Sequence, residues 1–238
     1  MTRFNKTLLA AALGVAMAPV AQTAHAEVSA NIGVTINYVW RGVTQTDDNA
    51  AVSGGIDWGH DSGFYLGTWA SNVDFGPGAG EVEWDIYGGY GGSVGDFGYD
   101  VGLAHYMYPD TDDADFTELA LSGSFKWFTV GLNYTVSSDI DDAAGSAEAF
   151  IEDDIYYYAS AGFEVAPTWS LGLTIGSYQF DDDGEAGADF DYTHWQADIG
   201  KSAGDFGDFT FSLGKVDDDN NFTADDDLKV FVSWSKSF

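Results

Sequence analysis

Apolar residues stand at every second position over most of this chain, which is the pattern of a half-buried β-strand. In residues 128–138, Phe128, Val130 and Leu132 alternate with Thr129 and Gly131. The stretch 28–42 places one set of residues on a single apolar face, namely Ile32, Val34, Ile36, Tyr38 and Trp40. We therefore expect an all-β fold built from many short strands.

Twelve such segments can be counted, each bounded by Gly, Asp or Asn. The expected strands are 28–42, 50–59, 63–74, 81–93, 96–108, 115–127, 128–138, 153–165, 168–180, 190–201, 207–216 and 227–238. Even-numbered connections are short, such as His60–Ser62 and Ala166–Pro167, whereas odd-numbered ones are longer and acidic.

The strands of a soluble β-sandwich also alternate with period two, so alternation alone does not distinguish a sandwich from a membrane barrel. The lengths of the loops distinguish the two folds. Strict short-long alternation around an even strand count is typical of an outer-membrane barrel with tight periplasmic turns and long external loops. We therefore predict an antiparallel transmembrane β-barrel of about twelve strands. A secreted sandwich with ordinary core aromatics remains the alternative.

The first 26 residues have the pattern of a secretory signal peptide. Arg3 and Lys6 precede the apolar stretch 8–20, and Ala24-His25-Ala26 is a small-x-small cleavage site. We predict cleavage after Ala26 and one barrel domain over residues 27–238. No later segment approaches 18 consecutive apolar residues, so no helical anchor is expected.

The charge is strongly acidic. Eight Lys and Arg oppose 39 Asp and Glu, for a net charge of −31. Nucleic acid is excluded as a partner, because phosphate binding requires clustered Lys and Arg. With no Cys, disulfides, thiolate metal sites and a cysteine nucleophile are excluded as well.

Residues 29–74 carry a resemblance. Ser29–Thr35, Tyr38–Thr46, Ser53–Asp57 and Gly63–Asp74 are similar to the opening of the TorF family of proposed porins. The resemblance implies an outer-membrane barrel that passes small solutes. That family supplies no substrate or site residues to carry over.

The last strand and the apolar face of the barrel suggest partners in the membrane. The last strand ends in Phe238, similar to the signal read by the barrel-insertion machinery. Outer-membrane lipids and lipopolysaccharide would surround the apolar face. Several tryptophans fall near strand ends, where aromatic girdles meet the membrane interfaces: Trp40, Trp58, Trp127, Trp169 and Trp234.

Enzymatic chemistry is weakly supported. A lipase or deacylase barrel would pair a Ser with a His on one face. His105 is flanked at two residues by Leu103 and Met107, and His194 by Tyr192 and Gln196. We therefore expect no catalytic residues and no cofactor, with an outer-membrane lipid-modifying enzyme as a remote alternative.

Calcium was the other candidate for specific chemistry. Residues 217–222 begin like an EF-hand loop, but Phe222 stands where Gly is needed and Leu228 where Glu is needed. A looser site from Asp217, Asp219, Asp225 and Asp227 stays open beside a solvated acidic loop. Whether a metal ion binds here is left undecided.

The distribution of the acidic residues is informative. Of the 39 carboxylates, 27 lie in the six long connections and their edges. On one rim they would concentrate cations and repel anions, although solubility in high salt explains the same excess. One such cluster is predicted to attract cations: Asp217, Asp218, Asp219, Asp225, Asp226 and Asp227.

Strand parity also predicts pore-lining residues. Arg41 shares the parity of Thr35, and Lys229 that of Ser233, so both are expected to point into the lumen as neighbours across the barrel closure. Opposite them, inward parity is expected for Glu83, Asp85 and Glu118. These residues would form either a charged constriction or a packed salt-bridge plug.

The sequence thus predicts a porin-like outer-membrane channel for passive diffusion of small hydrophilic solutes, with a preference for cations. The alternative is a non-conducting structural or surface-binding barrel whose acidic loops bind divalent cations. Conductance would discriminate between the two.

Overall fold

The computed structural model describes residues 27–76, 80–140, 149–181, 190–217 and 227–238. It contains fourteen strands and one 3₁₀ turn, η2 (Gly204–Phe206). The strands are β1 (Glu27–Thr35), β2 (Val39–Trp40), β3 (Val43–Thr44), β4 (Ala51–Gly59), β5 (Phe64–Asn72), β6 (Val82–Val94), β7 (Phe97–Met107), β8 (Phe116–Phe125), β9 (Phe128–Ser138), β10 (Ile155–Ala166), β11 (Trp169–Gln179), β12 (Tyr192–Ser202), β13 (Asp208–Asp217) and β14 (Lys229–Ser237). Among the described residues, no helix is long and apolar enough to cross a membrane.

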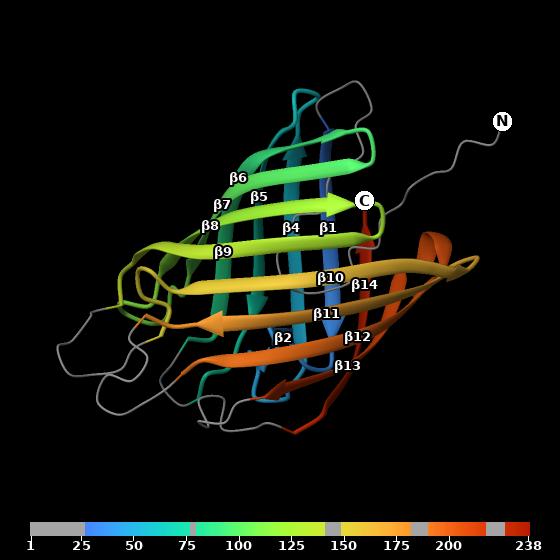
Figure 1. Ribbon diagram of the computed structural model, residues 1–238. Helices are drawn as coiled ribbons and strands as arrows, with labels where there is room; N and C mark the ends of the chain where they lie inside the picture. The colour runs from blue at the N-terminus through green and yellow to red at the C-terminus, as the bar shows by residue number, and fades with distance from the viewer. Residues whose placement is uncertain (1–26, 77–79, 141–148, 182–189, 218–226) are drawn as a thin grey trace.

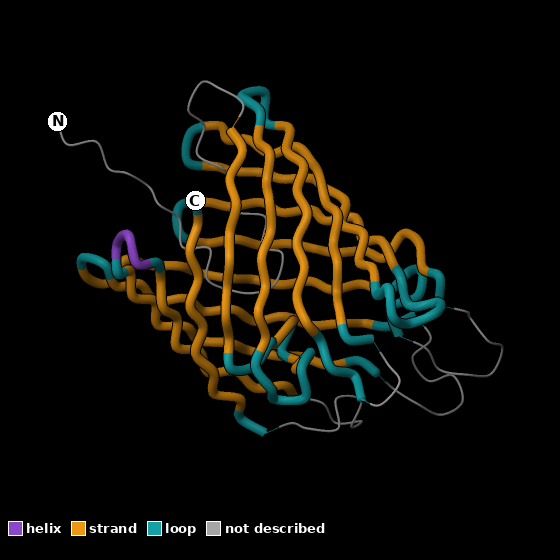
Figure 2. The backbone as a smooth tube through the Cα atoms, turned by 180° about the vertical axis from the view of Figure 1, so that it is seen from behind, coloured by secondary structure: helices purple, strands orange, loops and turns teal. Residues whose placement is uncertain are grey.

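Twelve of these strands close into one antiparallel barrel. Each strand pairs with the next, β1 pairs with both β4 and β14, and β2 and β3 form a separate two-stranded sheet. The chain end at Phe238 lies at the end of the barrel that carries the short turns, and the longer loops gather at the opposite end (Figures 1 and 2). The prediction of a twelve-stranded antiparallel barrel is therefore confirmed.

Alternation along the strands separates two surfaces. Outward-facing apolar side chains on all sides of the barrel are exposed, and examples are Val28, Ile56, Leu103, Ile175 and Val230. The inward positions between them carry Gly, Ser, Thr, Tyr and carboxylates. A closed barrel leaves no sheet edge, so its backbone N–H and C=O groups are paired without water. The exposed apolar side chains on its outer surface suit an apolar solvent such as lipid.

The first expected strand, 28–42, was too long. Strand β1 ends at Thr35, and the next residues turn into the barrel as the β2–β3 hairpin. Tyr38 and Trp40, assigned to the outer apolar face and in the case of Trp40 to a membrane girdle, are instead buried, with Trp40 only 7% exposed. The chain leaves the wall at the bend of Ile36 and Asn37, and the turn at Arg41 and Gly42, where both residues have positive φ, folds it back inside the barrel.

Tyrosine rings inside the barrel lie against glycines of the neighbouring strand. Tyr87 of β6 is paired in register with Gly67 of β5, and Tyr158 of β10 with Gly131 of β9. A Cβ added at either glycine would overlap the tyrosine ring. These glycines therefore allow the rings to lie along the wall.

We expect Gly67→Ala to destabilise the folded barrel by about 1–3 kcal/mol, because the added methyl group overpacks the site. The measurement is the urea unfolding midpoint of lipid-embedded protein, followed by heat-modifiable gel mobility. Gly162→Ala is the matched control, since a Cβ at Gly162 of β10 meets nothing within 4 Å. Equal midpoints for the two variants would contradict the packing argument.

Candidate functional site: a hairpin inside the barrel

The segment between β1 and β4 forms a hairpin that occupies the lumen. Trp40 pairs with Val43, which leaves Arg41 (φ 48°) and Gly42 (φ 90°) as a two-residue turn. Two positive φ values define the type I′ turn that suits tight β-hairpins. A Cβ at Gly42 would lie 2.6 Å from the Cβ of His194, so the turn is pressed against the wall at β12.

Arg41, at the tip of this hairpin, contacts the opposite wall of the barrel. Its two terminal nitrogens donate to the two carboxylate oxygens of Glu118, at 2.7 and 2.6 Å. Its guanidinium carbon lies 4.1 Å from the ring centre of Trp40, 4.3 Å from that of Tyr156 and 5.3 Å from that of Tyr178. The side chains of Arg41 and Glu118 are 7% and 0% exposed.

Glu118 is held by further donors from the wall. The hydroxyls of Tyr106 and Tyr178 donate to it at 3.3 Å each, and the amide of Asn133 donates at 3.2 Å. These partners come from β7, β11 and β9, while Glu118 itself lies on β8. A buried charge pair needs such additional hydrogen bonds to offset its desolvation.

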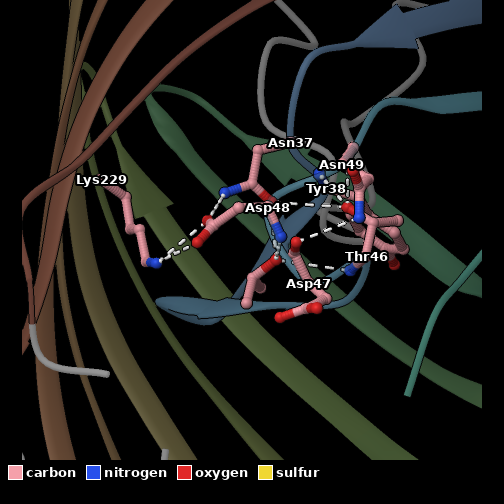
Figure 3. Close-up of polar contacts among 8 residues, drawn as sticks. Asn37, Tyr38, Thr46, Asp47, Asp48, Asn49 and Lys229 are labelled. Carbon is pink, nitrogen blue, oxygen red and sulfur yellow. Dashed lines mark hydrogen bonds and ion pairs between the residues drawn. The ribbon is translucent and has the colours of Figure 1, made fainter. Parts of the chain in front are cut away.

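The base of the hairpin is fixed by Asp48, as Figure 3 shows. The ammonium of Lys229 on β14 approaches Asp48 to 2.7 Å, and the amide of Asn37 donates to the same carboxylate at 2.6 Å. Tyr38 donates its backbone N–H to the hydroxyl of Thr46 at 3.1 Å. These contacts join the two arms of the hairpin to each other, and Lys229 ties its base to the barrel wall.

Arg41 and Lys229 were expected to be neighbours on adjacent strands, and the structure differs. Arg41 leaves the strand and pairs with Glu118, whereas Lys229 pairs with Asp48 at the hairpin base. Arg41 does point into the lumen, but from the hairpin and not from a wall strand, because β1 ends six residues before it.

The carboxylates of β6 also face the hairpin. Glu83 accepts hydrogen bonds from the hydroxyls of Tyr38, at 2.8 Å, and Tyr108, at 3.1 Å. Asp85 is fully buried, and neither of its carboxylate oxygens has a hydrogen-bond partner among the described residues. The wall around the hairpin therefore carries more carboxyl groups than Arg41 pairs with.

A second inward segment covers the hairpin from the loop end. The ring of Phe150 packs on those of Trp40, Phe116 and Tyr178, at centre distances of 5.9, 5.3 and 5.7 Å. Just before β10, the carboxylate of Asp154 accepts backbone N–H groups from residues 151 and 181. At the loop end of the barrel, two of the described loop segments and an aromatic cluster thus occupy the lumen.

The other half of the interior is lined by carboxylates with neutral partners. Tyr65 donates to Asp100 at 2.9 Å, and Ser212 and Gln196 donate to Asp198 at 2.6 and 2.9 Å. Over the described ranges, Arg41 and Lys229 are the cationic side chains that face inward.

The remaining sequence-predicted residues lie elsewhere. Asp217 ends β13 and Asp227 precedes β14, both exposed, while Asp218, Asp219, Asp225 and Asp226 fall outside the described residues. Within the described part of the chain, no three His, Cys, Asp or Glu side chains are grouped so as to hold a metal ion. His105 faces outward and His194 faces inward, where it contacts Tyr156.

This architecture is that of the outer-membrane channels. The KdgM porin matches with a TM-score of 0.56 at 8% identity, over 88% of this chain and 98% of that one. The NanC porin matches with a TM-score of 0.51 at 8% identity, over 89% of this chain and 98% of that one. An outer-membrane channel from Pseudomonas putida F1 matches with a TM-score of 0.51 at 10% identity, over 92% of this chain and 97% of that one. At these identities the likeness concerns the fold alone.

The chain belongs to the Gcw_chp family, described as bacterial proteins of unknown function, whose model matches residues 20–236. The matching family does not carry the TorF name, which stays a resemblance. No curated protein matches the sequence.

Breaking the pair at the hairpin tip should expose Arg41. Removing one partner of a buried ion pair costs about 3–5 kcal/mol, so we expect Glu118→Gln to increase tryptic cleavage after Arg41 at least tenfold. Mass spectrometry of the fragments measures this. Tyr65→Phe, which removes a hydrogen bond in the other half of the interior, should leave cleavage unchanged. A resistant Glu118→Gln variant would show that the pair does not hold the hairpin.

The cover segment should respond to pH. Burial raises the pKa of the Asp154 carboxyl from 3.8 to about 7, against the lowering effect of the N–H groups of residues 181, 150 and 151. Since the docked state holds the proton more tightly, its stability is greatest below pH 4 and is lost as the pH rises through 7. We expect amide protection at Ile151, corrected for intrinsic exchange, to fall between pH 5 and pH 8. Asp154→Asn should abolish this dependence.

Proposed function

We propose that this protein is a channel of the bacterial outer membrane that passes small hydrophilic cations by passive diffusion. The β2–β3 hairpin narrows the passage on the loop side. The likeness of the barrel to porins and outer-membrane channels supports the class. No cofactor enters this mechanism, because passage depends on the shape and charge of the lumen.

The imbalance of charge inside the barrel carries the cation preference. The inward-facing carboxylates of the strands outnumber the inward-facing cations: Asp57, Glu83, Asp100, Glu118 and Asp198. Against them stand Arg41 and Lys229, and each of these is already paired with a carboxylate. In a narrow lumen with low-dielectric walls, the excess negative charge attracts cations and opposes the entry of anions.

The filled external half limits how solutes pass. The hairpin tip contacts the wall at β8, and Phe150 covers it. Passage therefore requires movement of the hairpin or a narrow path beside it. We expect a small conductance with discrete transitions between levels, in contrast to a wide and permanently open pore.

The membrane partners follow from the outer surface. The exposed apolar side chains of the strands suit outer-membrane lipids, and lipopolysaccharide would meet the acidic loops through divalent cations. Strand β14, followed by the exposed ring of Phe238, is the segment we propose for contact with the barrel-insertion machinery.

The filled lumen also favours a second candidate, a non-conducting barrel whose acidic loops bind divalent cations at the cell surface. Packing of Trp40 against Tyr106, Phe150 and Tyr178 is the observation in its favour. This candidate predicts no current from correctly inserted protein, whereas the channel predicts a current that depends on the interior carboxylates.

We expect the reversal potential of the wild-type protein in a KCl gradient to have the sign set by K⁺. Replacing the wall carboxylates, in the double variant Asp100→Asn and Asp198→Asn, should move it toward zero because the lumen loses negative charge. The matched comparison neutralises the rim instead, by changing Asp217, Asp218, Asp219, Asp225, Asp226 and Asp227 to Asn.

If the reversal potential shifts more in the rim variant than in the wall variant, the loops and not the strands determine the charge selectivity. An unchanged potential in both variants would contradict charge selection altogether. Absence of current in every preparation that shows heat-modifiable mobility would favour the non-conducting barrel.

A further inference from the structure

The wall residues that receive Arg41 form a cage that does not include any part of the hairpin. Glu118 lies on β8, Tyr156 on β10 and Tyr178 on β11, with Tyr106 and Asn133 behind them on β7 and β9. Five different strands of the wall therefore contribute to one small site, and each of these strands pairs with both of its neighbours, with a register shift at Thr117/Glu118.

The cage is held in shape by contacts among its own residues. Tyr178 and Tyr106 donate to Glu118, as does Asn133. The hydroxyl of Tyr156 is 2.8 Å from Nε2 of His194, and the rings of Tyr156 and Tyr178 lie 5.7 Å apart. None of these contacts involves Arg41, so they do not have to break when another guanidinium takes its place.

The chemistry of the cage matches a guanidinium more closely than an ammonium ion. Both oxygens of Glu118 accept one nitrogen each from the planar fork of Arg41, and tyrosine rings flank the same group. Bidentate pairing and stacking are properties of guanidinium that a compact ammonium cannot reproduce. The nearest ring, that of Trp40, belongs to the hairpin, whereas the carboxylate and the other two rings belong to the wall. The wall alone therefore supplies the bidentate partner and two of the three rings.

Asp85 gives a second, independent indication that this part of the wall takes a hydrogen-bond donor. Its carboxyl group is fully buried on β6, and neither oxygen has a hydrogen-bond partner in the described part of the chain. A buried polar group without a partner costs free energy, which a ligand that donates hydrogen bonds removes. A guanidinium, with five N–H groups, is such a ligand.

We propose that this cage is a binding site for guanidinium-bearing solutes, and that Arg41 is its built-in occupant, which such a solute displaces. The inference deepens the proposed channel function, since solutes reach the cage through the lumen. Binding itself does not require conductance, so the two can be tested separately.

The test titrates refolded protein in detergent with methylguanidinium and, separately, with methylammonium, by isothermal titration calorimetry. In Arg41→Ala the cage is vacated, and we expect methylguanidinium to bind at least tenfold more tightly than methylammonium and at least tenfold more tightly than it binds the wild type. Adding Glu118→Gln to this variant should weaken methylguanidinium binding at least tenfold. Equal affinities for the two ligands, or undiminished binding in the double variant, would overturn the proposal.

Two further variants guard against loosened or misfolded protein. Arg41→Lys keeps the positive charge but loses the planar fork, so methylguanidinium should compete better than in the wild type. Lys229→Gln removes the other interior cation while leaving Arg41 in the cage, so its binding should stay as weak as that of the wild type. Heat-modifiable mobility verifies folding of each variant. A gain in Lys229→Gln equal to that in Arg41→Ala would show that binding follows net charge and would refute the cage.

Conductance measured on the same preparations separates the two conclusions. Methylguanidinium binding without any current would support the binding site and contradict the channel function. Current without selective binding would support the channel function and contradict the binding site.

Discussion

The ion pair between Arg41 and Glu118 is the contact on which the interior arrangement depends. It joins the tip of a short hairpin to the wall that faces it across the barrel, and it is almost completely buried. Water cannot compensate a separated pair at this depth, so each partner requires the other. The position of Trp40, the packing of Phe150 and the closure of the external half all follow from where this pair holds the hairpin.

The barrel wall and the hairpin play different physical roles. The wall is stabilised by twelve strands that pair all the way around the barrel, which no single side chain controls. The hairpin has one ladder of two residue pairs and is held by side-chain contacts at its tip and base. A rigid wall with a weakly paired insert allows the insert to move without loss of the barrel.

Strand positions could be predicted from the sequence because period-two alternation reports directly on the two solvents of a membrane barrel. Alternation also indicates which side of β6 and β8 carries Glu83, Asp85 and Glu118. The hairpin was missed, although Tyr38, Val39 and Trp40 break the alternation with three apolar residues in a row before Gly42. The pairing of Arg41 with Glu118 had no local signal, because the two residues are 77 positions apart and meet only after closure.

The tyrosines that lie on glycines bear on how related chains can diverge. Gly67 and Tyr87 share one volume of space, as do Gly131 and Tyr158, although 20 and 27 residues separate the members of each pair. A glycine in such a pair cannot acquire a side chain unless the facing ring becomes smaller. The two residues of each pair therefore have to change together, and the free width of the barrel at that level depends on both positions.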